Sequence, residues 1–272
     1  MKNKTYVITG ATSGIGLALV KILAKDNLVF AGYRSESKGK ELANLSENIS
    51  PFYVDYAKTE TISEAVKEIN SRCEKIDTLI NIAGCVVAGP VEKLSIDEVR
   101  RQFNVNVFGH IEMAQGLVEK LENGKIINIS SMASFGIFPF ISPYCASKKC
   151  LDMFFNSFLI ENKKNIKVIS IKPGVITTPL WEKSIKENIE VMNLCEGYEK
   201  EMEFIANNAR KNEKKGLCVD NVINLILKVD KLKNPKLSYT VGKDAFGAYL
   251  VSKLPQNIIN KLVKFGLKVR MK

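Results

Sequence analysis

Tyrosine and lysine residues four positions apart have the types and the spacing to support acid–base chemistry in this chain. Side chains at this spacing share one face of a helix, so the ammonium lies beside the phenol. An unperturbed tyrosine has a pKa of about 10, and a nearby cation favours its phenolate form. Such a pair can supply the proton that an alkoxide needs when a hydride is added to a ketone.

The sequence context distinguishes one of the three pairs with this spacing, which are Tyr144/Lys148, Tyr239/Lys243 and Tyr249/Lys253. Tyr239 lies on a predicted strand, where residues four apart are spread along the chain, and Tyr249 lies near a basic carboxyl-terminal segment. Tyr144 begins a predicted helix over 143–162, and Ser131 ends a predicted strand thirteen residues earlier. Ligands bind beyond the carboxyl ends of parallel strands, so we predict that Ser131, Tyr144 and Lys148 act together.

A glycine-rich turn, Thr9–Gly16, follows the first predicted strand and begins the first predicted helix. Glycines allow close backbone approach, and a helix amino terminus presents free N–H groups and partial positive charge to a pyrophosphate. A glycine-rich turn without a ligand is the alternative. The residues predicted to hold the pyrophosphate are Gly10, Thr12, Ser13, Gly14, Ile15 and Gly16.

The end of the second predicted strand indicates which dinucleotide is bound. A carboxylate there would hold the ribose 2′-hydroxyl of NAD, whereas an arginine suits the 2′-phosphate of NADP. The chain has Arg34 at this place and no carboxylate before Glu36, which favours NADP(H) over NAD(H). Arg34 as an ordinary solvated charge is the alternative. Asp55 either accepts from the adenine amino group or caps the helix that follows.

Short apolar runs alternate with helix-type periodicity along the chain, which predicts an α/β fold. We expect a single Rossmann-type, doubly wound parallel sheet of about seven strands, with helices on both faces and the whole chain, 1–272, in one dinucleotide-binding and catalytic domain. The predicted strands are Thr5–Thr9, Leu28–Ala31, Pro51–Val54, Thr78–Ile82, Lys125–Ile129, Ile166–Ile171 and Leu237–Val241.

Two segments near the carboxyl terminus depart from this alternation. The polar, helix-prone stretch 179–220 is either a movable lid over a hydrophobic substrate or an insertion that packs on the core; its apolar residues are Leu180, Trp181, Met192, Leu194, Tyr198, Met202, Phe204 and Ile205. The segment 254–270 predicts a basic amphipathic helix with an apolar stripe. We expect this helix to dock on its own domain or at a subunit interface, and peripheral contact with an anionic membrane is the alternative.

Composition excludes several classes of function. The net charge of +11 is compatible with nucleic acid, membrane or phosphorylated ligands, but no nucleic-acid-binding motif is present, so we expect no nucleic-acid partner. The six cysteines form no Cys-x-x-Cys pair and there is one histidine, His110, so we expect no metal. No apolar run is long enough to span a membrane and no secretory signal is recognisable, which predicts a cytoplasmic protein with peripheral membrane association as the alternative.

Six motifs follow one another along the chain: Thr9–Gly16, Asn81–Gly84, Asn106–Gly109, Asn128–Ser131, Tyr144–Lys148 and Pro173–Thr178. Together they resemble, in order and spacing, the motifs of the short-chain dehydrogenase/reductase family. Residue 82 is isoleucine where the family motif has a second asparagine. Subfamily features, including Arg34 and the stretch 234–245, resemble the steroid- and retinol-oxidoreducing branch.

The resemblance implies roles for the residues of these motifs. Tyr144 is expected to be the general acid in reduction and the base in oxidation. Lys148 is expected to bind the nicotinamide ribose and lower the pKa of Tyr144. Ser131 would stabilise the substrate oxygen, and Asn106 would hold a water relay to Lys148. Asn81, Ala83 and Gly84 would shape the cofactor groove; the residues expected at the nicotinamide are Pro173, Gly174, Ile176 and Thr178.

The substrate implied is a small carbonyl compound or secondary alcohol. The apolar segment 139–143 before Tyr144, together with the branch resemblance, favours a hydrophobic, steroid-like molecule. A sugar or acyl-thioester reductase is the alternative within the enzyme class, and a catalytically silent NADP-binding sensor is the alternative outside it. We expect His110 to be structural and the chain to form a homo-oligomer, a dimer or a tetramer.

Overall fold

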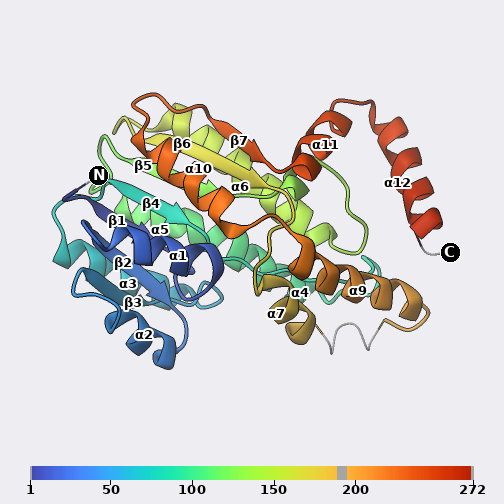
Figure 1. The fold of residues 1–272 in the computed structure, drawn as a ribbon, viewed down its shortest axis with the longest axis horizontal. Helices are drawn as coiled ribbons and strands as arrows, with labels where there is room; N and C mark the ends of the chain where they lie inside the picture. Colours follow the sequence, from blue (N-terminus) through green and yellow to red (C-terminus); the bar gives the residue numbers. More distant parts are fainter. Residues whose placement is uncertain (1, 189–194, 271–272) are drawn as a thin grey trace.

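The computed structural model describes residues 2–188 and 195–270, and its core is a seven-stranded, wholly parallel sheet with the order β3-β2-β1-β4-β5-β6-β7 (Figure 1). The predicted fold is therefore confirmed. The chain winds outward in one direction from β1 to β3 and in the other from β4 to β7, so a crevice forms at the carboxyl ends of β1 and β4. The strands are β1 Thr5–Ile8, β2 Leu28–Tyr33, β3 Ile49–Tyr53, β4 Thr78–Asn81, β5 Lys125–Ile129, β6 Lys167–Pro173 and β7 Ser238–Val241.

Both faces of the sheet are covered, because successive apolar residues on each strand point to opposite sides. On β1, Tyr6 and Ile8 pack toward α1 (Gly14–Leu23) and α10 (Val219–Lys231), together with Leu42 of α2 (Glu36–Ala43). Val7 packs on the opposite face, whose helices are α3 Thr59–Arg72, α5 Gly109–Leu117 and α6 Ser142–Glu161. Each fully buried aliphatic or aromatic side chain stabilises the fold by roughly 1.5–3 kcal/mol, which fixes the ends of the strands relative to the helices.

The remaining elements gather beyond the carboxyl ends of the strands (Figure 1). The segment between β4 and β5 contains α4 (Ile96–Phe103) and a π-helical turn, η1 (Asn104–Phe108); a short 3-10 helix, η2 (Met132–Phe135), follows β5. The predicted insertion 179–220 contains α7 (Leu180–Glu187) and α9 (Glu199–Lys215). Met192 and Leu194 of its predicted apolar set lie outside the described residues.

Two helices follow the last strand. α11 spans Lys243–Val251 and α12 spans Gln256–Arg270, close to the predicted helix 254–270. Figure 1 shows α12 projecting from the molecule on the side where the strands end, away from the sheet. Among the residues that the structure describes, no helix combines the length and the apolar character needed to cross a bilayer.

Candidate active site

A cleft of about 260 Å³ lies at the carboxyl ends of the strands and is lined by residues of the glycine-rich turn. Gly10 and Gly14 have φ angles of +64° and +49°, which favour glycine. A Cβ at Gly10 would lie 2.9 Å from the backbone N of Ala83, and one at Gly16 would lie 2.2 Å from the backbone O of Gly10. The turn therefore needs glycine both for its conformation and for its close approach to the next loop.

The amino terminus of α1 opens into this cleft. The helix begins at Gly14, after the extended residue Ser13, so its first N–H groups and the positive end of its dipole are available to a phosphate. Of the predicted pyrophosphate set, Gly10, Thr12, Ser13, Gly14 and Ile15 line the cleft. Gly16 is packed behind the turn against Gly10 and supports the loop without lining the cleft.

Arg34 and Asp55 line the cleft just beyond the carboxyl ends of β2 and β3, and their contact with the adenosine stays a prediction. The Arg34 guanidinium lies 3.5 Å from a carboxylate oxygen of Glu187 on α7 and its side chain is 52% exposed, so it is open to a ligand. The Asp55 Oδ1 accepts a hydrogen bond from the N–H of Ala57 at 3.1 Å. Asp55 is not the N-cap of α3, because that position is Lys58.

The loop after β4 is held by the hydroxyl of Thr9, a contact that sequence reasoning did not include. The Thr9 Oγ1 accepts hydrogen bonds from the N–H groups of Ile82 at 3.0 Å and Ala83 at 3.3 Å. Ala83 and Gly84 line the cleft as predicted. Asn81 differs from the prediction: it is buried beneath the cleft, where its amide donates to the Asn128 Oδ1 at 2.8 Å and joins β4 to β5.

Tyr144 and Lys148 project from the first turns of α6, and both are buried, at 8% and 4% exposure. The Lys148 ammonium lies 5.9 Å from the centre of the Tyr144 ring and donates to the carbonyl of Ile129 at 2.9 Å. A Cβ at Gly84 would lie 3.8 Å from this ammonium. The structure thus brings the predicted pair together with the end of β5 and the loop after β4.

Burial dominates the acid–base properties of the pair. It raises the pKa of Tyr144 to about 12, and a hydrogen bond with Ser131 partly offsets this. Burial lowers the pKa of Lys148 to about 8, against the opposing effect of the Asp152 carboxylate. Loss of hydration disfavours the charged phenolate, so the net shift of the Tyr144 pKa is upward; the expected lowering of this pKa by Lys148 stays a prediction. Tyr144 is therefore protonated at neutral pH.

Ser131 is placed beside Tyr144 by the turn that ends β5. It is the N-cap of η2, where its Oγ accepts from the N–H of Ala133 at 3.1 Å. Because that bond uses the oxygen as an acceptor, the hydroxyl proton remains available for donation to a substrate oxygen.

Asn106 and His110 hold the loop after β4 through hydrogen bonds, and the water relay expected at Asn106 stays a prediction. Asn106 is fully buried in the π-helical turn, where its side chain exchanges hydrogen bonds with the backbone of Cys85 at 2.9 and 3.0 Å and donates to the Ser147 hydroxyl at 3.0 Å. The His110 Nε2 lies 2.8 Å from the carbonyl of Ala83. Burial lowers the pKa of His110 to about 3, which keeps the ring neutral and suits a structural role.

The loop after β6 forms the opposite wall of the cleft. Pro173, Gly174, Ile176 and Thr178 line it, and their contact with the nicotinamide stays a prediction. Asp244 of α11 holds this loop, since its Oδ2 accepts from the N–H of Val175 at 2.7 Å and its carboxylate fills the space where a Gly174 side chain would be. In the sequence, Asp244 is recognisable only as a carboxylate in the first turn of a helix. That position does not reveal its contact with Val175.

A buried ion pair links the catalytic helix to this same strand. The Lys172 ammonium lies 2.7 Å from a carboxylate oxygen of Asp152, and both side chains are nearly buried. Asp152 lies one turn beyond Lys148 on α6. Lys172 also lies 4.7 Å from the centre of the Phe135 ring in η2. The pair therefore connects α6, which carries Lys148, with β6, which ends just before Gly174, and with η2, whose N-cap is Ser131.

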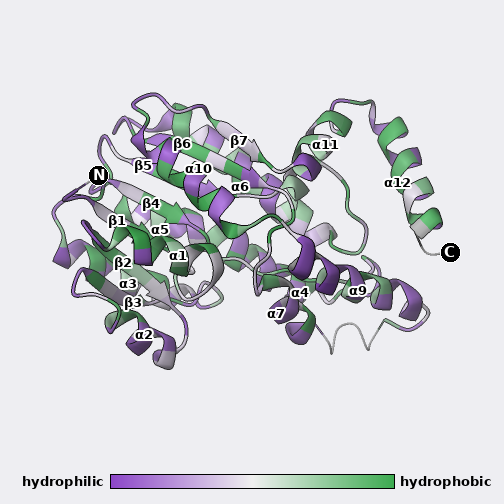
Figure 2. Ribbon diagram, in the orientation of Figure 1, coloured by the Kyte–Doolittle hydropathy of each residue, from purple (hydrophilic) through white to green (hydrophobic). Residues whose placement is uncertain are grey.

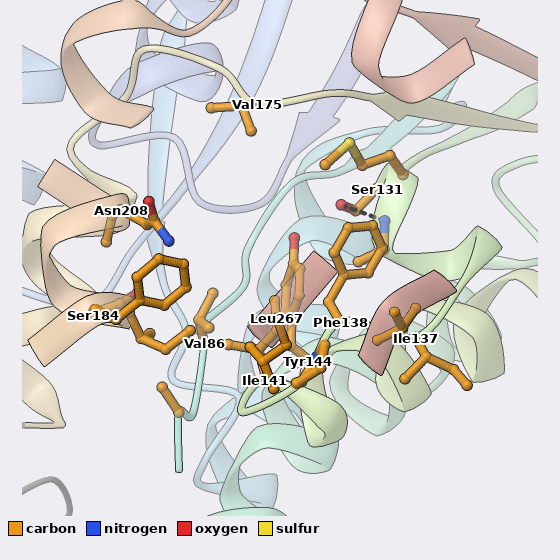
Figure 3. A pocket seen from close by; sticks show the side chains of 18 of the residues that line it. Val86, Ser131, Ile137, Phe138, Ile141, Tyr144, Val175, Ser184, Asn208 and Leu267 are labelled. Atoms are coloured by element: carbon orange, nitrogen blue, oxygen red, sulfur yellow. Dashed lines mark hydrogen bonds between the residues drawn. The ribbon is translucent and has the colours of Figure 1, made fainter. Parts of the chain in front are cut away.

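A second cavity of about 530 Å³ meets the cofactor cleft at Ser131, Tyr144 and Gly174, which line both spaces. Figure 3 shows the Tyr144 hydroxyl pointing into this cavity, with the apolar side chains of Val86, Phe138 and Ile141 nearby. Helices α7, α9 and α12 provide the outer wall, in which Asn208 and Ser184 are polar. The Tyr144 phenol therefore lies where the cleft and the apolar cavity meet.

Comparisons with known proteins agree with this geometry. Residues 4–189 match the short chain dehydrogenase family. The NADPH-dependent 3-dehydrocapnine reductase of Ornithobacterium rhinotracheale is 30% identical over 96% of each chain. The NADPH-dependent 1-acyldihydroxyacetone phosphate reductase of Saccharomyces cerevisiae is 33% identical over 72% of this chain and 69% of its own.

Among solved structures, a short chain dehydrogenase from Burkholderia cenocepacia J2315 in complex with NADP superposes with a TM-score of 0.73. It is 20% identical, and the match covers 96% of this chain and 98% of that chain. The family match begins just before β1, continues through α7 and includes all six motifs. The chain belongs to the short-chain dehydrogenase/reductase family.

Proposed function

We propose that this protein is an NADP(H)-dependent oxidoreductase that reduces the carbonyl group of a small hydrophobic substrate, with Tyr144 as the proton donor. The observation that carries the proposal is the meeting of the dinucleotide cleft and the apolar cavity at Ser131, Tyr144 and Gly174. The names of both curated relatives specify NADPH-dependent reductases, and Arg34 at the adenosine end of the cleft suits a 2′-phosphate.

Each residue has a distinct part in the reaction. Bound NADPH supplies the hydride. Ser131 donates a hydrogen bond to the carbonyl oxygen and stabilises the charge that develops on it. Tyr144, whose raised pKa keeps it protonated, gives its proton to that oxygen as the alkoxide forms. Lys148 stabilises the phenolate that remains and holds the nicotinamide ribose, while Asn106 keeps the Cys85 backbone beside it in place.

The lining of the second cavity supports a hydrophobic substrate. Its inner wall contains Val86, Phe138 and Ile141, and its outer wall contains Phe204 and Leu267. The cavity volume of about 530 Å³ is within the ordinary range for small-molecule sites. We propose α7 and α9 as the cover of this cavity, and the single-domain organisation over 1–272 stays a prediction.

The test is the consumption of NADPH by the purified chain with four matched classes of substrate: steroid ketones, linear long-chain ketones, keto sugars and acyl thioesters. We expect kcat/KM for the best hydrophobic ketone to exceed that for any keto sugar by at least about ten-fold, because each buried CH₂ contributes roughly 0.8 kcal/mol. A preference for the sugar or the thioester would contradict the proposed substrate class. NADPH binding without turnover of any class would favour the sensor alternative.

We also propose that the chain forms a homo-oligomer. Met153, Phe154 and Ile160 on α6 are 57%, 48% and 85% exposed, although they are large apolar side chains. Large apolar side chains exposed on the same helix are consistent with a protein interface. Light scattering should give the mass of a dimer or a tetramer, and a monomer at micromolar concentration would contradict the prediction.

A further inference from the structure

The carboxyl-terminal helices concentrate the exposed apolar surface of the described chain. Nine of the twenty exposed large hydrophobic side chains lie between Phe246 and Val269. On α12, Ile258, Leu262, Phe265 and Val269 are 42%, 49%, 69% and 57% exposed. Their spacing of four, three and four residues places them on one face of the helix. We call these four residues the outer stripe.

A neighbouring face of the same helix forms part of the substrate cavity. Ile259 is buried, and Val263, Gly266 and Leu267 line the cavity opposite Phe204 and Ile205 of α9. Leu262 belongs to both faces, since it lines the cavity and is also half exposed. The apolar lining of the cavity is therefore continuous with the apolar exterior of α12. Figure 2 shows hydrophobic residues along α11 and α12 at this edge of the molecule.

The charged residues of α12 indicate which kind of partner suits the outer stripe. No acidic residue follows Asp244 in the sequence, whereas Lys261, Lys264 and Lys268 lie on α12 and border the outer stripe. A basic rim beside an apolar stripe is complementary to an anionic lipid surface. A symmetric contact between two copies of α12 would instead bring like charges together, which opposes association.

We propose that α12 lies on an anionic bilayer through its outer stripe and that the substrate, a single-chain amphiphile bearing a ketone, passes from the lipid into the cavity between α12 and α9. The inference rests on the proposed function, and it specifies both the substrate class and the surface from which the substrate is taken. A molecule leaving the acyl layer would stay in apolar surroundings up to Tyr144, because Leu262, Leu267 and Phe138 line one cavity.

The binding test uses vesicles of phosphatidylglycerol and of phosphatidylcholine with the full chain. We expect at least ten-fold more protein on the anionic vesicles, and a reduction of this difference at high salt. The double variant Phe265→Glu/Val269→Glu should reduce binding at least ten-fold, because it places carboxylates in the outer stripe outside the cavity lining. The matched control is Leu45→Glu, which adds a carboxylate at a 44% exposed apolar site after α2 and should leave vesicle binding unchanged.

The activity test separates this inference from the proposed function. We expect the double variant to reduce a short, water-soluble ketone as fast as the unmodified chain and to reduce a long-chain ketone embedded in anionic vesicles at least ten-fold more slowly. Suppose that the double variant and the unmodified chain both reduce the soluble ketone. If they also bind vesicles equally, or reduce the embedded ketone equally fast, the membrane inference alone is overturned. A loss of oligomers in the double variant without a change in vesicle binding would overturn it as well. Failure of the unmodified chain with every ketone would overturn the proposed function instead.

Discussion

At the residue scale, the site combines an acid that stays protonated with a base that titrates close to neutral pH. Burial raises the pKa of Tyr144 to about 12 and lowers that of Lys148 to about 8. The charged and titratable groups that act on Lys148 are the Asp152 carboxylate and the Cys85 thiol, and both favour its ammonium form. Asp152 therefore acts as a positioning residue whose charge affects Lys148.

A first prediction concerns the pH dependence of ketone reduction. The Lys148 ammonium is lost as the pH rises through about 8, so reduction should slow above that pH. Asp152→Asn removes the carboxylate that raises the pKa of Lys148, and the decline should then begin at lower pH. The measurement is kcat against pH for both proteins, with Asp152→Glu as the variant that keeps the charge. Superimposable profiles for the Asn variant and the unmodified chain would contradict the role of Asp152.

A second prediction concerns the choice of coenzyme at Arg34, whose guanidinium lies 3.5 Å from Glu187. Arg34→Asp replaces attraction for a 2′-phosphate by repulsion and should change the NADPH-to-NADH preference by about ten- to hundred-fold, since a hydrogen bond between charged groups contributes roughly 1.5–3 kcal/mol. Glu187→Gln removes the competing carboxylate and should tighten NADPH by up to about five-fold, the range of an exposed ion pair. Unchanged selectivity in the Asp variant would place the phosphate elsewhere.

At the element scale, the first turn of α11 holds the loop that faces the nicotinamide end of the cleft. The Asp244 Oδ2 accepts from the N–H of Val175 at 2.7 Å. We predict that Asp244→Ala raises the KM for NADPH about five-fold, because an exposed hydrogen bond of this kind contributes roughly 1 kcal/mol. Asp244→Asn keeps an acceptor oxygen and should have a smaller effect. Equal KM values in all three proteins would show that the loop keeps its position without this contact.

Elements with local signals could be predicted from the sequence. The seven strands follow from apolar runs, and their parallel arrangement follows from the intervening helices. The boundaries differ where tertiary contacts decide them. β2 continues beyond its predicted end through Gly32, because a Cβ there would lie 3.0 Å from the Phe52 ring and glycine allows the pairing with β3 to continue.

Contacts between distant elements could not be predicted in the same way. The Thr9 hydroxyl, the Asp152–Lys172 pair and Asp244 join residues far apart in the chain, and each looks like an ordinary polar residue in its local sequence. Asn81 belongs to a recognisable motif, yet its side chain faces β5 beneath the cleft. The shift in the pKa of Tyr144 depends on burial, which spacing along a helix does not reveal.

At the scale of the whole molecule, the two ends of the sheet differ: one carries a buried hydrogen-bond network and the other carries the cleft and the cavity. The amino-terminal ends are joined by the buried carboxylate of Asp230, which accepts hydrogen bonds from Tyr6 at 2.8 Å and Thr78 at 2.7 Å. The carboxyl ends carry the cleft and the cavity. This buried hydrogen-bond network thus lies at the opposite end of the strands from the cavity, which α7, α9 and α12 line.

A further prediction concerns the stability of the whole fold in acid. His110 has a pKa near 3 in the folded chain, below its ordinary value of 6.5. The unfolded chain gains a proton below pH 6.5 while the folded chain does not, so the free energy of unfolding falls by roughly 1.4 kcal/mol per pH unit in that window. His110→Gln can still donate to Ala83 and does not titrate, so its stability should fall less steeply between pH 6.5 and 4.5. The measurement is the free energy of unfolding of both proteins between pH 6.5 and 4.5. An equal decrease in the two proteins would contradict this role of His110.

The most direct measurement is the turnover of a hydrophobic ketone by Tyr144→Phe, alongside its NADPH affinity from fluorescence titration. We predict that kcat falls by about 10²–10⁴-fold, the range for loss of a general acid, while the Kd for NADPH changes less than about three-fold, because the phenol hydroxyl is lost and the ring remains. Full turnover by the Phe variant would contradict the assignment of Tyr144 as the proton donor.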